Sequence, residues 1–370
     1  MDKKIILAKA GSGKTFHICK TIDVNQRNLI LAFTNQNISN IHRELKDSNN
    51  GLIPSKTVVM TFHSFVYHTF IRPYELIYSD FFKMPNFTSQ GVEINYQPEP
   101  QSINGKANNK YISKDKICHY YTKNMNLVYV SRMSELPLYA NSKSNNLLTN
   151  AFDYLNKFYD CIYIDEVQDF RNYDWDLLEK IIKGMYNMTL VGDFYQHSVS
   201  GTNNSGRPFD KYKTEEKYLK YLSDLKLNVD ITTLPKSRRC PSAVSNYVSK
   251  KTGVDLNTHE DCTNVGEIKY IESVEHSIRI LKNNQITKLV WENAKKYPFN
   301  AINWSYSKGD TYPAICVVLT KDLSKNFFKD DFIMKDGITK NKLYVALTRT
   351  AGDLYIMSSQ QFEDALKQIE

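Results

Sequence analysis

A glycine-rich segment near the start of the chain has the residue types of a phosphate-binding loop. It reads Ala8-Lys9-Ala10-Gly11-Ser12-Gly13-Lys14-Thr15 and directly follows an apolar run. Glycines there let backbone N–H groups wrap the β- and γ-phosphates of a nucleoside triphosphate, because a Cβ would collide with them. Lys14 would neutralise the phosphates, and the Thr15 hydroxyl would ligate Mg²⁺. The loop therefore predicts nucleotide binding by Ala10, Gly11, Ser12, Gly13, Lys14 and Thr15.

A second segment carries two adjacent carboxylates at the end of an apolar run. The run at 161–164 ends in Asp165-Glu166-Val167-Gln168-Asp169. At the carboxyl end of a parallel strand beside the P-loop strand, one carboxylate can hold Mg²⁺ and another can polarise the attacking water. We expect Asp165 to serve the metal and Glu166 to serve as the general base. Alone, the segment also fits a solvated acidic turn, but together with the P-loop it predicts nucleotide hydrolysis.

This acidic segment resembles that of superfamily 1 DNA helicases of the UvrD/Rep type. Other segments similar to that family's motifs follow in the family's order: Phe33-Thr34-Asn35, Thr61-Phe62-His63-Ser64-Phe65, Gly192-Asp193-Phe194-Tyr195-Gln196, Arg238-Arg239, Ser307-Lys308-Gly309 and Tyr344-Val345-Ala346-Leu347-Thr348-Arg349. With the P-loop they extend over nearly the full length of the chain. The V-A-L-T-R and D-E-V-Q-D matches are specific, and the T-F-H-S and K-G matches are weak individually.

The resemblance implies ATP and Mg²⁺ as cofactors of a DNA-stimulated ATPase. The implied catalytic residues are Lys14, Asp165, Glu166, Gln196, Arg239 and Arg349, with the metal held by Thr15 and Asp165. Gln196 would sense the γ-phosphate, and the two arginines would reach it from a second domain. Arg238 and Gly309 would complete the nucleotide site. Arg238 stands where the family usually has a tyrosine on the adenine, so relaxed selectivity for the base is expected.

Single-stranded DNA is the implied partner. The residues assigned to it by resemblance are Phe33, Thr34, Asn35, Thr61, Phe62 and His63. Their rings could stack on bases without sequence preference, although ordinary core packing is the alternative for both phenylalanines. RNA stays an open alternative, because such contacts go to phosphates and base faces more than to sugar edges.

The elements that must position these residues follow from the hydrophobic pattern. Apolar runs at 5–8, 29–33, 58–60, 161–164 and 189–191, alternating with helical patterns, predict a parallel sheet with helices on both faces. Further strands at 268–271, 315–319 and 354–357, with helices at 242–251, 273–283, 340–349 and 362–369, predict a second one. With the resemblance, they predict an α/β protein of two RecA-like P-loop domains with ATP in the cleft between them. The expected domains are 1–225, carrying a small helical and irregular insertion at about 66–150, and 226–370.

Composition limits the class of protein without deciding it. The chain has 370 residues, 48 Lys+Arg against 40 Asp+Glu, a formal net charge of +8 and six dispersed cysteines. The charge permits a nucleic-acid partner but also fits an ordinary basic surface. No run approaches the ~18 apolar residues of a membrane span, and the first residues do not form a secretory signal. We therefore expect a reduced, cytoplasmic protein without a membrane contact or a structural metal.

Three departures from the family pattern leave two functions open. The P-loop strand begins at about residue 5, so we expect the family's upstream adenine-reading segment to be absent. After Gln196, His197 is the only aromatic ring up to Thr202 and there is no arginine, and the second half has no room for the large accessory subdomain. The first function is an ATP-dependent DNA helicase or translocase. The alternative is a nucleotide-dependent switch, or a regulatory ATPase subunit of a DNA repair or phage-defence complex, with a protein partner such as a nuclease. A kinase-like P-loop enzyme is disfavoured, because it has no use for two cleft arginines.

Overall fold

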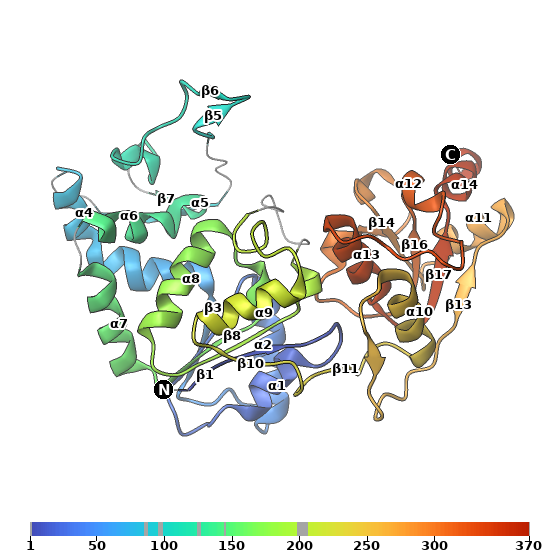
Figure 1. The fold of residues 1–370 in the computed structure, drawn as a ribbon, viewed down its shortest axis with the longest axis horizontal. Coiled ribbons are helices and arrows are strands. Elements are labelled where there is room, and N and C mark those ends of the chain that lie inside the picture. The colour runs from blue at the N-terminus through green and yellow to red at the C-terminus, as the bar shows by residue number, and fades with distance from the viewer. Residues whose placement is uncertain are drawn as a thin grey trace.

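The computed structural model describes residues 2–84, 88–94, 99–123, 127–143, 146–197 and 206–369. The chain forms two α/β domains that lie side by side, the first in blue to yellow and the second in gold to red (Figure 1). Each domain is built on a parallel sheet with helices on both faces, as predicted. No helix among the described residues is long and apolar enough to cross a membrane.

The first sheet has six parallel strands in the order β10-β1-β9-β8-β2-β3. Its strands are β1 (Lys3–Leu7), β2 (Asn28–Ala32), β3 (Thr57–Thr61), β8 (Cys161–Ile164), β9 (Met188–Gly192) and β10 (Asn228–Asp230). Five of them are the predicted strands. β10 pairs with β1, so the first domain continues past residue 225 to at least Asp230, and the predicted boundary is too early. A three-residue strand with one apolar side chain is too short to show a period.

Strand alternation sends neighbouring side chains to opposite faces of this sheet, and each face is covered by its own helices. Ile6 packs with α1 (Lys14–Thr21) and α2 (Asn35–Ser48), whereas Ile5 belongs to the core formed with α7 (Leu147–Phe158), α8 (Asn172–Gly184) and α9 (Glu215–Asp224). Because all six strands are parallel, the loops after β1, β2, β3, β8 and β9 meet at one edge. That edge faces the second domain.

The chain between β3 and β8 is irregular, as the composition of this region predicts. Its described elements are α3 (Phe62–Val66), η1 (Tyr67–Ile71), η2 (Arg72–Tyr74), α4 (Glu75–Phe81), β4 (Gly91–Glu93), β5 (Ser102–Ile103), β6 (Lys106–Ala107), η3 (Ile117–His119), β7 (Leu127–Tyr129), α5 (Val130–Met133), α6 (Glu135–Lys143) and α7. The two-stranded β5–β6 ladder stands out from the body of the domain (Figure 1). Helix α7 packs against α8 and contributes Leu147, Leu148, Ala151 and Leu155 to the first core.

The second sheet has five parallel strands in the order β13-β17-β16-β14-β15. They are β13 (Ile268–Tyr270), β14 (Thr287–Val290), β15 (Ala301–Asn303), β16 (Tyr312–Val318) and β17 (Thr350–Met357). One face packs on α10 (Ser242–Thr252) and α13 (Ile338–Leu347), and the other on α11 (Val274–Lys282) and α14 (Ser359–Ile369). Short elements complete the chain: β11 (Lys236–Ser237), β12 (Asn257–Thr258), α12 (Lys321–Ser324), η4 (Val167–Asp169), η5 (Phe194–Gln196), η6 (Ala294–Lys296) and η7 (Trp304–Ser307).

Candidate nucleotide site at the domain interface

The P-loop lies between the end of β1 and the start of α1 and packs against the second domain. Gly11 and Gly13 have φ values of 72° and 87°, in the left-handed region that favours glycine. A Cβ at Gly11 would lie 2.6 Å from both Arg239 Cβ and Ser237 Oγ, so no larger residue fits. Lys14, the first residue of α1, is buried. The local sequence thus produces the tight turn that a phosphate cradle requires.

The two residues predicted to hold the metal are in contact. Thr15 Oγ1 donates to Asp165 Oδ2 at 2.7 Å, and Asp165 is 1% exposed at the end of β8. A hydroxyl and a carboxylate are hard oxygen ligands, so this pair fits Mg²⁺. Burial and the neighbouring charge of Glu166 raise the pKa of Asp165 to about 6. A nearby cation would favour the ionised carboxylate.

Glu166 adopts the left-handed conformation, with φ 54° and ψ 46°, which is uncommon for a residue other than glycine. Gln168 Nε2 donates to its carboxylate, and Lys308 Nζ from the second domain lies 3.5 Å from Glu166 Oε2. Burial alone would raise the pKa of Glu166, but the charges of Lys308 and Lys14 lower it to about 2. The predicted base is therefore ionised at neutral pH and faces the cleft between the domains.

Two arginines of the second domain, Arg349 and Arg239, face the cleft opposite Glu166. Arg349 is 1% exposed, and its guanidinium donates from Nε to Val345 O at 3.0 Å and from Nη2 to Thr348 Oγ1 at 3.2 Å. Arg239 Nη1 donates to Thr348 O at 3.3 Å. Burial and the charge of Arg239 lower the pKa of Arg349 to about 10, which leaves it charged at neutral pH. Both guanidinium groups are thus held by hydrogen bonds to residues at the end of α13, although Arg239 itself lies in the segment before α10.

Most of the predicted site residues line one cavity of about 390 Å³ between the domains. Its walls include Gly11, Gly13, Lys14, Thr15, Asp165, Glu166, Gln196, Arg238, Arg239, Gly309 and Arg349, together with Phe16, Asn37, Asn40, Arg43, Glu44, Asn264 and Thr311. Of the residues predicted for catalysis and nucleotide binding, only Ala10 and Ser12 do not line it. Ser12 is buried within the loop, and the Ala10 N–H is bonded to Tyr344.

Arg238 and Phe16 line the cavity beside Gly13. A Cβ at Gly13 would lie 3.9 Å from Arg238 Cδ and 4.0 Å from Phe16 Cβ. Arg238 is bonded to His259 Nε2 at 2.9 Å and to Asp261 at 3.2 Å, and the Phe16 side chain is 45% exposed. Sequence reasoning missed Phe16. The sequence feature that could have identified it is an apolar residue immediately after Thr15, at a solvent-exposed position of the helix.

The cross-domain contact of Lys308 is a second feature that sequence reasoning missed. Lys308 follows η7 of the second domain and forms an ion pair with Asp169 at the end of η4 of the first. Both side chains are nearly buried, at 11% and 3% exposed. The K-G motif is visible in the sequence, but the partner of its lysine lies far away along the chain. Only the folded structure brings the two together.

The residues predicted to contact single-stranded DNA lie at the same edge of the first sheet as Asp165. Phe33, Thr34 and Asn35 follow β2, and Thr61, Phe62 and His63 lie at or after the end of β3. The two strands are paired at Ala32 and Thr61. Thr34 and Asn35 are exposed, and the Phe33 and His63 rings meet edge to face at 5.0 Å. Thr34 and Thr61 are also the N-cap residues of α2 and α3.

Phe62 is the exception among these residues. Its side chain is 0% exposed and packs against Phe170 with ring centroids 4.7 Å apart. A base has no access to this ring, so the prediction that Phe62 binds nucleic acid is wrong and the alternative of core packing is right. A T-F-H-S pattern cannot tell which of its two rings turns inward.

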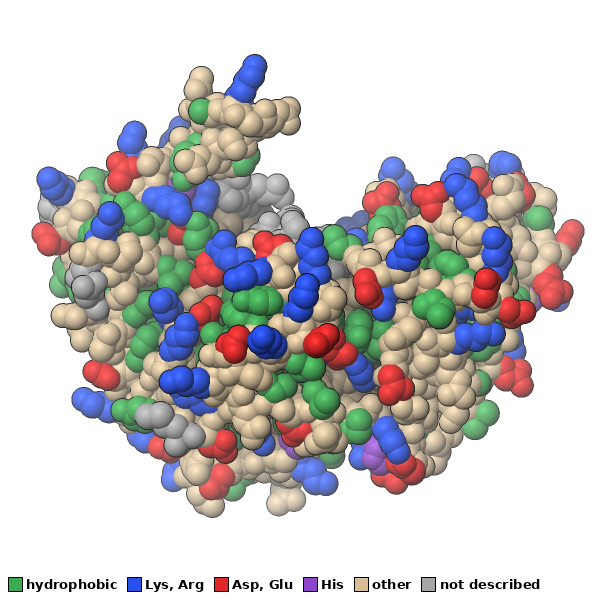
Figure 2. All heavy atoms as spheres, in the orientation of Figure 1, with side chains coloured by type: hydrophobic (Ala, Val, Ile, Leu, Met, Phe, Trp, Pro, Cys, Tyr) green, Lys and Arg blue, Asp and Glu red, His purple; other side chains and the backbone are tan. Residues whose placement is uncertain are grey.

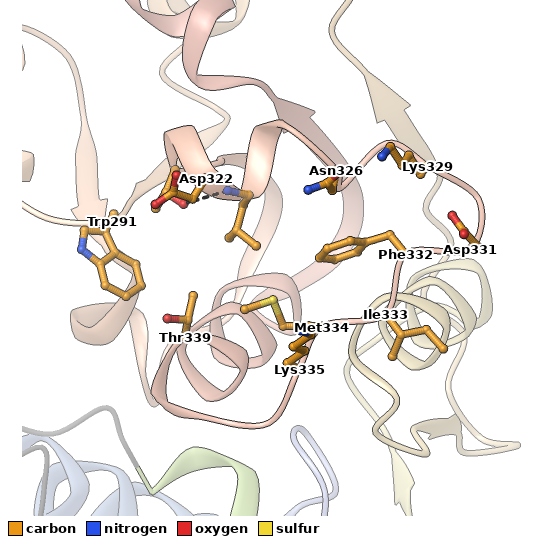
Figure 3. Close-up of a pocket in the computed structure, with 12 residues that line it drawn as sticks. Trp291, Asp322, Asn326, Lys329, Asp331, Phe332, Ile333, Met334, Lys335 and Thr339 are labelled. Carbon is orange, nitrogen blue, oxygen red and sulfur yellow. Dashed lines mark hydrogen bonds between the residues drawn. The ribbon is translucent and has the colours of Figure 1, made fainter.

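The surface around the interface carries both signs of charge. Lys and Arg side chains are frequent over the middle of the face in Figure 2, where they are interspersed with Asp and Glu. A wider cavity of about 800 Å³ lies within the second domain, between Trp291, Phe332 and Thr339 (Figure 3). It contains none of the predicted site residues. The chemistry-bearing residues are thus gathered in the smaller cavity between the domains.

Two parallel-sheet domains that meet over a phosphate-binding loop define a P-loop nucleotide-binding protein. The family model of the AAA domain matches residues 2–202, which is more than half of the chain. The chain therefore belongs to this family. No curated protein matches it.

Three solved helicase structures are similar to the chain at low identity. The arterivirus helicase, nonstructural protein 10 in complex with DNA, has a TM-score of 0.44 and 12% identity, covering 96% of this chain and 60% of that one. The PRRSV helicase has a TM-score of 0.44 and 12% identity, covering 96% and 52%. Dbp5 of S. cerevisiae, bound to RNA and ADP BeF3, has 0.37 and 8%, covering 99% and 82%. The chain thus spans 60% and 52% of the two viral chains.

Proposed function

We propose that the protein is an ATP-dependent DNA translocase or helicase of the UvrD/Rep type, which couples Mg²⁺-dependent hydrolysis of ATP to movement on single-stranded DNA. The observation that carries the proposal is the composition of the interdomain cavity. Lys14 and Glu166 come from one domain and Arg239 and Arg349 from the other. An arginine stabilises the charge of a transferring phosphoryl group only when it is close to that group. Hydrolysis would therefore depend on closure of the domains.

Each side chain has a defined task in this proposal. Lys14 and the loop amides would bind the phosphates, and Thr15 with Asp165 would hold Mg²⁺, which neutralises charge on the phosphate oxygens when bound. Glu166 is ionised and would accept a proton from the attacking water. Gln196 Nε2 donates to Asp193 Oδ2 at 2.8 Å, which fixes its amide at the cavity wall.

Nucleic acid would bind across the sheet edge that carries Phe33, Asn35 and His63. Cycles of closing and opening while both domains hold a strand would move the protein along it. A ring that is half open, such as Phe33 beside His63, suits contact with base faces irrespective of sequence. A 3′ to 5′ direction is expected by analogy with the family alone.

One observation favours the alternative of a nucleotide-dependent switch or regulatory ATPase subunit. Among the described residues, His197 is the only ring that follows Gln196 before Phe209, and the two rings are stacked on each other at 4.2 Å and 2°. Neither can offer both faces to a base. An ATPase that signals closure to a partner protein, such as a nuclease in a repair or phage-defence complex, needs no such platform.

The test is ATP hydrolysis by the wild-type protein and by Glu166→Gln, with and without single-stranded DNA or RNA. We expect single-stranded DNA to stimulate the wild type and Glu166→Gln to lower kcat at least ~100-fold, because the base is lost. Glu216→Gln, an exposed glutamate of the same domain, is the matched control and should leave kcat unchanged. Activity that survives Glu166→Gln would refute the assigned base. A wild type stimulated by no nucleic acid would favour the switch.

The same assay addresses the nucleobase. Arg238 and Phe16 offer a guanidinium plane and a ring to the cavity beside Gly13, and either can lie on any base. We expect similar kcat/KM for ATP and GTP. A strong preference for ATP would show that other groups read the base edge.

A further inference from the structure

One buried side chain of the second domain contacts the P-loop backbone but has no task in the proposed chemistry. Tyr344 lies on α13 and is 0% exposed. Its hydroxyl accepts a hydrogen bond from the Ala10 N–H at 2.8 Å and donates one to Asp193 Oδ2 at 3.2 Å. A single oxygen therefore joins the phosphate-binding loop, the end of β9 and the helix of the opposite domain.

Asp193 links Tyr344 to Gln196, which is predicted to sense the γ-phosphate, and to Glu166, the predicted base. Its carboxylate accepts the hydrogen bond from Gln196 Nε2, and its N–H donates to Gln168 Oε1 at 3.0 Å. Gln168 Nε2 in turn donates to the Glu166 carboxylate. A continuous series of hydrogen bonds thus connects the Tyr344 hydroxyl, through Asp193 and Gln168, to the predicted base Glu166.

The contact depends on the two domains being docked. Ala10 is 0% exposed and packs in the core of the second domain, with Tyr344 among its neighbours. Within the described part of the chain, Tyr344 Oη is the only hydrogen-bond acceptor found for the Ala10 N–H. A buried N–H without a partner costs about 1–3 kcal/mol. Withdrawal of α13 would leave Ala10 without its partner and Asp193 without one of its donors.

We propose that Tyr344 is a positioning residue that aligns Gln196 and Glu166, through Asp193, only while the second domain is docked on the P-loop. The inference rests on the proposed function, because it assigns Tyr344 to the hydrolysis of the bound nucleotide. Tyr344 does not line the cavity, so in this role it would not contact the reacting atoms. It acts on the geometry of the groups that do.

The first test is Tyr344→Phe, which removes the oxygen and keeps the ring. We expect kcat to fall roughly 10-fold, as for the loss of a hydrogen bond to a charged group, with the Kd for nucleotide changed less than about 3-fold. Tyr247→Phe is the matched control, because its hydroxyl bonds to Tyr270 Oη at 3.3 Å, away from the cavity. It should leave kcat unchanged.

The second test reads the contact without any hydrolysis. In protein labelled with ¹⁵N-alanine, amide exchange at Ala10 should be at least about 10-fold faster in Tyr344→Phe than in wild type, and unchanged in Tyr247→Phe. Equal kcat for Tyr344→Phe and wild type, or unchanged exchange at Ala10, would overturn the inference. Failure of the proposed function is a separate result, namely a wild-type protein that does not hydrolyse ATP.

Discussion

Arg349 is a fully buried charge that nevertheless lines the nucleotide cavity. Its Nε and Nη2 atoms are held by Val345 O and Thr348 Oγ1, so the guanidinium has a fixed position near the cleft. We expect Arg349→Ala to lower kcat at least ~100-fold while nucleotide still binds, because the arginine stabilises charge that develops only during transfer. Kinetics and equilibrium binding of a nucleotide analogue separate the two effects. Loss of binding instead would show that the arginine is structural.

His197 makes the stability of the protein depend on pH. Burial lowers its pKa to about 4, whereas an unfolded histidine titrates near 6.5. Between these values the unfolded state binds more protons, so stability is full above pH 6.5 and falls as the pH drops toward 4. We expect about 2 kcal/mol less stability from this group at pH 5.0 than at pH 7.5. Urea unfolding of wild type and His197→Gln measures it, and an equal pH dependence in both would contradict the assignment.

The sequence shows the P-loop and the carboxylates because their chemistry requires fixed residue types within a few positions. It cannot show the contacts of Lys308 and Tyr344 within the site, because their partners Asp169 and Ala10 come from segments far apart in the chain. Phe62 fails for a related reason. Whether a ring faces the core or the solvent depends on what packs against it, and Phe170 does so here.

At the scale of elements, a strand is predictable when it is a continuous apolar run. β14 escapes prediction because Lys288 interrupts its run, although this lysine is buried and its Nζ donates to Asn283 O at 2.5 Å. β15 and β10 have three residues each, and Asn303 ends the first while Asn228 and Asp230 flank the single apolar residue of the second, so neither forms an apolar run. Long-range pairing in the sheet, and not local preference, decides that these segments become strands.

A buried glutamate is the centre of a cluster of ion pairs in the irregular region between β3 and β8. Glu135 is 1% exposed and is contacted by Lys114 Nζ at 2.6 Å, Arg132 Nη1 at 2.8 Å and His119 Nε2 at 3.2 Å. Burial would raise its pKa, but the hydrogen bonds from His119 and Lys114 and the charge of Arg132 lower it to about 2. This contribution to stability is present above pH 4.5 and is lost as the pH falls toward 2.

We expect Glu135→Gln to lower the free energy of unfolding by about 3 kcal/mol, because it removes the buried carboxylate that pairs with the partly buried Arg132 and with Lys114. Urea unfolding at pH 7.5 is the measurement, with the exposed Glu216→Gln as control. A loss below about 1 kcal/mol would mean that the cluster is compensated elsewhere.

For the whole molecule, the ion pair of Lys308 with Asp169 is a buried bond between the domains. Lys308→Gln removes the ion-pair partner of Asp169 and one of the cations that act on Glu166, and should destabilise the docked arrangement by about 3 kcal/mol. We expect a larger radius of gyration for this variant in small-angle X-ray scattering without nucleotide. Lys325→Gln, which breaks an exposed pair with Asp322 inside the second domain, is the control. Identical scattering from Lys308→Gln and wild type would contradict this expectation.

The path between the domains is short. β10 ends at Asp230 and β11 begins at Lys236, and the Asp230 carboxylate accepts hydrogen bonds from the N–H groups of Thr232 and Thr233 at 2.8 and 2.9 Å. So brief a connection keeps the second domain at an effective concentration in the millimolar range near the P-loop. Docking is consequently a unimolecular event that dilution of the protein does not weaken. Cleavage within 231–235 would turn it into an encounter between two fragments, governed by how much of each is present.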